Sequence, residues 1–128
     1  MDQERLSLSP LAAFRDHLAR GELAYQYDPA SGRAVFPPRV IGPGTGNPDL
    51  AWRASAGLGT VHAVTVISPR DQAPYNVVLV DMDEGFRLMS RVEGVPADDV
   101  RIGLRVRAQV HTPPDGQPPY PVFLPEAA

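Results

Sequence analysis

Apolar residues recur at helical spacing near the start of the chain. Leu11, Phe14 and Leu18 fall at positions i, i+3 and i+7, which predicts a helix over residues 10–20 with one apolar stripe. Ser9 suits the N-cap of this helix, and a glycine follows its last residue. A helix of only about three turns is marginal by itself, so we expect it to pack on its own domain or on a partner.

The following stretch, residues 25–48, is interrupted throughout by glycine and proline and holds few apolar residues. Such a density of breakers is incompatible with long helices or continuous strands. The most that it predicts is a small hairpin with residues 33–36 as one strand. We interpret this stretch as an appendage with little core of its own.

From residue 50 onward the pattern becomes that of short β-strands. The alternation is clearest at residues 104–111, where every second residue is apolar and the residues between them are polar or charged. The predicted strands cover residues 50–55, 58–68, 75–82, 86–92, 104–111 and 120–124. Closure into a small barrel would remove the open edges of such a sheet. A five-stranded OB-type barrel is the first choice, and an SH3-like barrel is second on pattern alone.

Composition narrows the function classes. The 128 residues suffice for one domain, and no apolar run is long enough to cross a membrane, so we expect a cytoplasmic protein. The absence of cysteine excludes disulfides, thiol catalysis and cysteine-ligated metals. All 12 basic residues are arginine, which excludes lysine chemistry and is typical of a GC-rich bacterial genome. The net charge of −3 provides no overall attraction to nucleic acid.

No group of residues has the spacing of a catalytic or metal site. The three histidines, His17, His62 and His111, are far apart in the sequence and are expected in ordinary surface or half-buried positions. The acidic residues between 81 and 84 fit the end of a strand and its turn. The glycine-rich run 42–46 lacks the flanking strand and helix of a phosphate-binding loop. We therefore expect no catalysis by this chain alone.

Several runs along the predicted strands are nevertheless specific in their order and spacing. They are Gly59-Thr60-Val61, Pro74-Tyr75, the run from Leu79 to Gly85, and the run from Asp98 to Val106. In these runs the chain resembles the zinc-ribbon/OB-fold accessory proteins that associate with thiolase-like acyl-CoA enzymes. The resemblance extends from the helix at residue 10 to residue 123. It implies a mainly β protein, a small OB-fold barrel preceded by a short N-terminal helix and a zinc-ribbon-like hairpin.

The resemblance also locates the positions where such a ribbon carries two CxxC pairs. Here these four positions hold Asp28, Ser31, Gly42 and Thr45, with the spacing kept and the thiolates gone. A structural zinc needs four good donors, so we predict a degenerate, metal-free ribbon. The implied organisation is an N-terminal helix region at 1–24, the ribbon appendage at 25–49 and the OB-fold barrel at 50–128.

The function that the resemblance implies is that of a non-catalytic accessory subunit, which binds a thiolase-like enzyme in acyl-CoA metabolism. The residues expected to contact that partner are Leu11, Phe14, Leu18, Phe36, Pro37 and Pro38. Arginines beside aromatic residues could grip coenzyme A, and the candidates are Arg33, Arg39, Arg53 and Trp52. A solvated basic rim is the alternative interpretation of these arginines. No tightly bound cofactor is expected, only a CoA thioester shared with the partner.

A second hypothesis belongs to another functional class. OB-fold barrels often bind single-stranded nucleic acid through basic grooves and stacked aromatic side chains. This chain has only nine aromatic residues (one Trp, four Tyr and four Phe), and its charge balance is acidic. Single-stranded nucleic-acid binding is therefore the alternative, and salt-dependent retention on single-stranded DNA would distinguish it.

Overall fold

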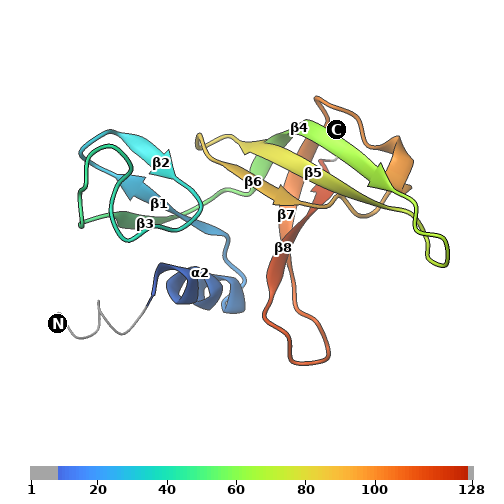
Figure 1. Cartoon of the computed structure of the whole chain (residues 1–128), viewed down its shortest axis with the longest axis horizontal. Helices are drawn as coiled ribbons and strands as arrows, with labels where there is room; N and C mark the ends of the chain where they lie inside the picture. The colour runs from blue at the N-terminus through green and yellow to red at the C-terminus, as the bar shows by residue number, and fades with distance from the viewer. Residues whose placement is uncertain (1–8, 127–128) are drawn as a thin grey trace.

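The computed structural model describes residues 9–126, which form one helix and two antiparallel sheets (Figure 1). The helix, α2, spans Pro10–Ala19 and begins as the sequence predicts. The Ser9 hydroxyl accepts a hydrogen bond from the amide of Ala12, and Gly21 follows the helix with a φ of 78°. No helix within residues 9–126 is long and apolar enough to span a membrane.

The smaller sheet has three strands in the order β2-β1-β3. Strand β1 (Ala24–Asp28) lies in the centre, between β2 (Arg33–Val35) and β3 (Ala51–Ala54). The strand expected at residues 50–55 was predicted to belong to the barrel, and it pairs with β1 instead. Pairing between strands this distant in sequence depends on register across the fold, which the local pattern does not contain.

The larger sheet has five strands in the order β6-β5-β4-β7-β8. Their bounds are β4 Leu58–Ile67, β5 Tyr75–Met82, β6 Arg87–Ser90, β7 Arg105–His111 and β8 Tyr120–Pro125. A short 3-10 helix, η1 (Ala97–Asp99), joins the two halves of the sheet. Strand β4 pairs with β5 along its whole length and with β7 only through its first residues. This order is that of the predicted OB fold.

The two edges of the larger sheet meet, but not through a continuous ladder. One parallel bridge joins Val92, just after β6, to Phe123 on β8. Two main-chain hydrogen bonds flank it: Phe123 N–H to the Arg91 carbonyl at 2.9 Å, and Glu93 N–H to the Phe123 carbonyl at 2.8 Å. The buried Asn76 side chain binds both main-chain groups of Val92, at 2.8 and 3.1 Å. The Ser90 hydroxyl also donates a hydrogen bond to the Pro121 carbonyl at 2.6 Å, so the two edges meet through a few bonds near this bridge and the sheet is not closed into a full barrel.

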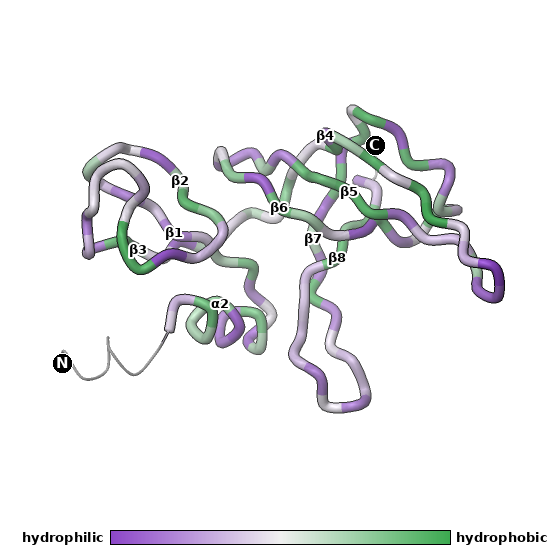
Figure 2. The backbone as a smooth tube through the Cα atoms, viewed as in Figure 1, coloured by the Kyte–Doolittle hydropathy of each residue, from purple (hydrophilic) through white to green (hydrophobic). Residues whose placement is uncertain are grey.

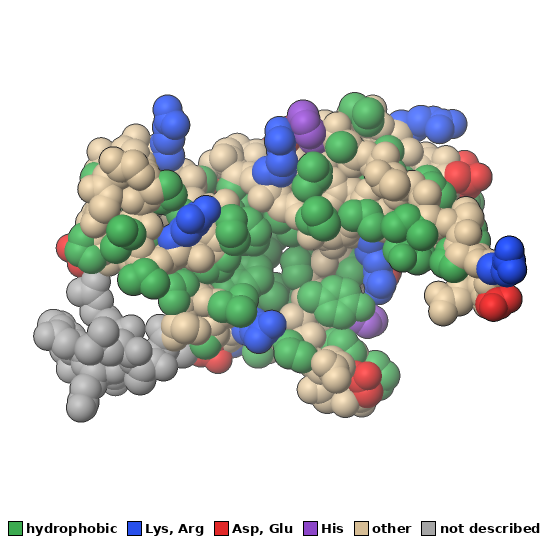
Figure 3. All heavy atoms as spheres, in the orientation of Figure 1, with side chains coloured by type: hydrophobic (Ala, Val, Ile, Leu, Met, Phe, Trp, Pro, Cys, Tyr) green, Lys and Arg blue, Asp and Glu red, His purple; other side chains and the backbone are tan. Residues whose placement is uncertain are grey.

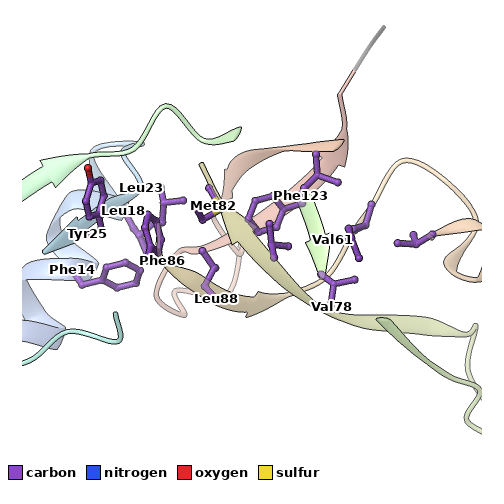
Figure 4. Packing of buried hydrophobic residues seen from close by; sticks show 14 residues of the cluster. Phe14, Leu18, Leu23, Tyr25, Val61, Val78, Met82, Phe86, Leu88 and Phe123 are labelled. Carbon is purple, nitrogen blue, oxygen red and sulfur yellow. The ribbon is translucent and has the colours of Figure 1, made fainter. Parts of the chain in front are cut away.

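One hydrophobic core runs through both sheets (Figure 4). In the OB-fold sheet it is built from alternate valines of β5, Val78 and Val80, with Phe123 of β8, all fully buried. Apolar residues are frequent along these strands, whereas the loop between β4 and β5 is hydrophilic (Figure 2). Burying an aliphatic or aromatic side chain of this size contributes roughly 1.5–3 kcal/mol, so this alternation accounts for the sheet's inner face.

Aromatic rings connect the small sheet to the OB-fold sheet. The ring of Phe86, at the start of the β6 hairpin arm, stacks on Tyr25 of β1 with centroids 4.8 Å apart. It also lies 5.3 Å from the ring of Phe36, which in turn meets Phe14 of α2 at 5.5 Å. Figure 4 shows Phe86, Tyr25 and Phe14 converging between the two sheets. The helix, the ribbon and the OB-fold sheet therefore share one apolar centre.

Candidate functional site

Two turns in the ribbon have the same backbone pattern. In residues 28–32 the carbonyl of the first residue accepts hydrogen bonds from the amides of the fourth and fifth, at 3.2 and 2.8 Å. In residues 42–46 the same two hydrogen bonds measure 3.3 and 2.8 Å. Each turn ends in a glycine with positive φ, Gly32 at 70° and Gly46 at 67°. The two pairs of predicted degenerate ligand positions thus lie in matching turns.

The carboxylate of Asp28 lies where these two turns meet. Asp28 is fully buried, and its Oδ2 accepts a hydrogen bond from the Thr45 hydroxyl at 2.6 Å. Its Oδ1 accepts from the Asn47 amide and from the Ala30 N–H, both at 2.9 Å. These bonds, that from Thr45 foremost, lower the pKa of Asp28 below its ordinary value. The buried charge is therefore fully hydrogen-bonded.

Gly42, the third of the four predicted degenerate ligand positions, has no side chain, and the space that one would occupy is already filled. A Cβ placed on Gly42 would collide with Oδ2 of Asp28 and with the hydroxyl of Thr45. A tetrahedral zinc site needs four free donors. These positions supply one carboxylate with both oxygens engaged, two hydroxyls and no donor at Gly42. The residues present do not fit a structural zinc ion.

The four residues predicted to contact coenzyme A do not all share one face of the small sheet. Arg33 pairs across the strands with Asp28, whereas Arg53 pairs with Tyr25. Since Tyr25 and Asp28 are three residues apart on β1, their cross-strand partners lie on opposite faces. Arg53 stacks over the ring of Tyr27 at 3.5 Å on its own face. The remaining aromatic candidate, Trp52, is placed by its pairing on the face of Arg33.

The segment that carries Arg39 is held by a side-chain clamp that sequence reasoning did not find. The buried Gln26 accepts a hydrogen bond from the Arg39 N–H at 2.6 Å and donates one to its carbonyl at 2.8 Å. The clamp fixes the chain just before Val40 and Ile41, which are 73% and 50% exposed. The only sequence signal for it was a glutamine between two tyrosines, at Tyr25-Gln26-Tyr27.

The helix residues predicted to contact a partner have two different environments. Phe14 and Leu18 are buried in the chain's own core, at 8% and 2% exposure, because they cover the aromatic centre below the small sheet. Leu11 is 48% exposed. The helix thus packs on its own domain through Phe14 and Leu18, and of these three predicted contact residues Leu11 faces outward.

The ribbon residues predicted to contact a partner divide in the same way. Phe36 is half-buried and packs between Phe14 and Phe86. Pro37 is exposed and Pro38 is half-buried. Of these three residues, the two prolines thus lie toward the outside of the ribbon, directly before the clamped Arg39.

A groove lies between α2 and the long β7–β8 hairpin (Figure 3). Its volume is about 600 Å³. Hydrophobic side chains gather on both of its walls in Figure 3. One wall is the helix with Leu11, and the other is the proline-rich hairpin that ends in Tyr120. We call this the helix–hairpin groove; its lining residues are Leu11, Phe14, Arg15, Leu18, Pro113, Asp115, Gln117, Pro118, Pro119, Tyr120 and Pro121.

Arginines on the outer face of the OB-fold sheet are bound by carboxylates. Arg87 donates to Asp81 at 2.6 Å, and Arg105 makes two hydrogen bonds of 2.8 Å to Asp83. These contacts lower the pKa of both aspartates and raise that of both arginines. Arg107 is paired with the last described acidic residue, Glu126, at 2.9 and 3.0 Å. On this face the arginines alternate with the carboxylates that they bind, so it does not present a continuous basic surface.

The histidines are as dispersed as the sequence predicts. His17 pairs with Glu22 at 2.7 Å, His62 lies 3.2 Å from Asp81, and His111 packs on Tyr120. Within the part of the chain that the structure describes, no group of three histidine, cysteine or acidic residues could hold a metal ion.

Comparison with known proteins identifies the OB-fold part. Residues 52–111 match a family model described as the C-terminal OB-fold domain of ChsH2. The chain is 32% identical over 78 residues to a DUF35 domain-containing scaffold protein of Methanothermobacter thermautotrophicus. It is 33% identical over 58 residues to a protein of the same name from Methanocaldococcus jannaschii. These matches cover 56% and 41% of this chain, and only 59% and 41% of the two archaeal relatives.

Two solved structures resemble more of the chain. A chain of the structure titled "Ltp2-ChsH2(DUF35) aldolase" superposes with a TM-score of 0.78 at 28% identity, covering 89% of this chain and 92% of that one. A DUF35-family protein of unknown function from Sulfolobus solfataricus superposes with a TM-score of 0.64 at 16% identity. It covers 98% of this chain and 93% of that one, and at this identity it shows the fold alone.

Proposed function

We propose, from the match of residues 52–111 to the ChsH2 C-terminal OB-fold model, that the chain is a non-catalytic accessory subunit of a thiolase- or aldolase-type enzyme. The observation that carries the proposal is the likeness over 89% of the chain to a chain of the Ltp2–ChsH2(DUF35) aldolase. The scaffold-protein names of the two archaeal relatives point to the same class of role. The reaction of the partner would make or cleave carbon–carbon bonds in CoA thioesters.

The helix–hairpin groove is the docking face that we propose for the partner. Leu11 at its rim is 48% exposed, and the opposite wall consists largely of prolines. Apolar side chains in a concave surface with few charges are typical of the core of a protein–protein interface. A partner helix or loop that fills the groove would contact both Leu11 and the hairpin. The exposed Pro37 belongs to the neighbouring ribbon surface that could extend the contact.

A finer part of the proposal concerns the substrate. Arg33 and Arg39 are exposed, and within residues 9–126 neither forms an ion pair with an acidic residue. The arginines of the OB-fold sheet do form such pairs. A guanidinium group binds phosphate through paired hydrogen bonds. We propose that these two arginines contact the phosphates of a CoA thioester bound mainly by the partner. A cytoplasmic location and a bacterial source are part of the same proposal.

The alternative function, binding of single-stranded nucleic acid, is less well supported. Its affinity would depend on arginines free to neutralise phosphates. On the OB-fold sheet, Arg87, Arg105 and Arg107 are instead occupied by carboxylates. Retention on single-stranded DNA at low salt, decreasing steeply as salt is added, would favour this alternative. We expect no retention.

The first experiment is recovery of the tagged chain from its native host, with mass spectrometry of the bound proteins. We expect a thiolase- or aldolase-type subunit in stoichiometric amount. Leu11→Asp, at the groove, should abolish its recovery, whereas Met89→Asp should leave it unchanged, because Met89 is a similarly exposed apolar residue on β6. Equal recovery with both variants would contradict the groove as the docking face. Repeated recovery without any acyl-CoA enzyme would contradict the accessory role itself.

The second experiment uses the reconstituted pair. The purified partner should turn over its CoA thioester faster with the chain than without it. Arg33→Ala combined with Arg39→Ala should raise the KM for the thioester and leave kcat nearly unchanged. Arg70→Ala, which removes an exposed loop arginine, is the matched control. An unchanged KM in the double variant would refute the CoA contact and leave the accessory role intact.

A further inference from the structure

The ribbon retains the architecture of a metal site without its ligands. Its two turns, 28–32 and 42–46, have the same hydrogen bonds and the same terminal glycine. In a zinc ribbon such turns are held together by the ion, whose binding supplies much of the folding free energy. Here something else must hold the turns in register, because the donors do not fit zinc.

The hydrogen bonds of Asp28 connect the two turns to each other. The bond from Ala30 lies within the first turn, and the bonds from Thr45 and Asn47 come from the second turn and its exit, 17 and 19 residues away. A buried carboxylate with three donors forms charge-assisted bonds, which are shorter and stronger than neutral ones. One side chain therefore contacts both turns from the inside, as a metal ion would.

The second turn is adapted to this carboxylate. Gly42 leaves open the space that Oδ2 of Asp28 occupies, and any Cβ there would collide with it. The Thr45 hydroxyl also approaches the Gly42 carbonyl at 3.4 Å and accepts from the Asn47 N–H at 3.3 Å. The contacts thus depend on three features together. They are the carboxylate of Asp28, the absence of a side chain at Gly42 and the hydroxyl of Thr45.

We propose that the buried carboxylate of Asp28, with Thr45, Asn47 and the bare Gly42, replaces the metal ion of a zinc ribbon as the cross-link between its two turns. The ribbon then folds without metal. The pair of turns persists because a hydrogen-bonded anion occupies the centre that a cation would otherwise occupy.

The test compares local stability in the ribbon with that in the OB-fold sheet of the full chain. Asp28→Asn keeps the size of the side chain but removes the charge and turns one acceptor into a donor. We expect amide hydrogen exchange at residues 30–32 and 44–47 to accelerate about tenfold or more. Exchange at Val80, in the centre of β5, should stay within about twofold. Asp71→Asn, in an exposed loop, is the matched control and should change neither.

A conservative pair at Thr45 separates the hydrogen bond from mere packing. Thr45→Val keeps the shape and loses the hydroxyl, so its ribbon amides should exchange as fast as those of Asp28→Asn. Thr45→Ser keeps the hydroxyl and should exchange like the wild type. Equal exchange in the two Thr45 variants, or wild-type exchange in Asp28→Asn, would overturn the proposal.

Metal analysis provides an independent test. The wild-type chain, purified with added zinc, should hold less than about 0.1 zinc per chain, and a chelator should not change its unfolding midpoint. The fourfold variant Asp28→Cys, Ser31→Cys, Gly42→Cys and Thr45→Cys should bind about one Co²⁺ per chain with tetrahedral thiolate absorption. One tightly held zinc in the wild type, or a chelator-sensitive midpoint, would refute the carboxylate cross-link whatever the fourfold variant does.

Discussion

Phe86 is the side chain on which the connection between ribbon and OB-fold sheet most depends. It is 5% exposed and contacts the rings of Tyr25 and Phe36, with centroids 4.8 and 5.3 Å away. Replacement by alanine removes a buried ring and leaves a cavity, which costs about 3–5 kcal/mol in protein cores. This cost includes the loss of each aromatic ring contact, which contributes about 0.5–1.5 kcal/mol. The total is a large share of the about 5–15 kcal/mol that stabilises a typical domain.

Equilibrium unfolding in urea measures this loss with two probes. Trp52, the only tryptophan, lies on β3 and reports on the small sheet through its fluorescence. Far-ultraviolet circular dichroism reports on the whole chain. For Phe86→Ala we expect a free energy of unfolding lower by about 3–5 kcal/mol, with the Trp52 transition at lower urea than the overall transition. In the wild type the two transitions should coincide.

The matched control is Met89→Ala on the same β6 arm, since Met89 is 67% exposed. Removing an exposed side chain of this kind should change the free energy by less than about 0.5 kcal/mol. Phe86→Leu should fall between the two, because it keeps apolar volume and loses the stacking. If Phe86→Ala unfolds like Met89→Ala, the aromatic centre does not couple the two sheets and the reasoning fails.

Three further predictions concern the OB-fold sheet. Asn76→Ala would leave both main-chain groups of Val92 buried without a partner, so urea unfolding should show a loss of about 2–4 kcal/mol; a loss below 1 kcal/mol would mean that water replaces the amide. Gly59→Ala would push a Cβ into a side chain and a carbonyl of β5, and should lower the free energy of unfolding by about 1–3 kcal/mol; a thermal midpoint equal to that of the wild type would contradict this. Since pairing with Arg105 lowers the pKa of Asp83 in the folded state, its contribution to stability is present above the ordinary value of 3.8 and is lost as the pH falls through the folded value. Thermal unfolding between pH 5 and 2 should therefore depend less on pH in Asp83→Asn than in the wild type, and parallel curves would contradict this.

Local patterns sufficed for several elements. The cap at Ser9 and the glycine at 21 place α2 within one residue, and the alternation at 104–111 matches β7 at Arg105–His111. Both signals are local, because they depend on residues within one turn or one strand. The OB fold that the resemblance implies is confirmed by the match of residues 52–111 to the ChsH2 OB-fold model.

Features that depend on distant parts of the chain were not predictable in this way. An apolar stripe on α2 indicates that one face of the helix is covered. The sequence around Phe14 and Leu18 does not identify the element that covers it. Strand β3 has the composition of a barrel strand and pairs with β1 through a register that the pattern does not encode. Asp28 was identified only as a missing zinc ligand, since its bonds to the second turn span 17 and 19 residues.

The single bridge between Val92 and Phe123 gives the barrel a weak seam. The strand pairs that flank the seam, β5–β6 and β7–β8, are joined over four and six residue pairs, respectively. A junction held by one bridge separates more readily than a ladder of several residue pairs. Thermal fluctuation or mechanical tension on the end of β8 should therefore open the molecule here first. The two amides at the seam, of Glu93 and Phe123, should then lose their protection while the sheet beside them stays intact.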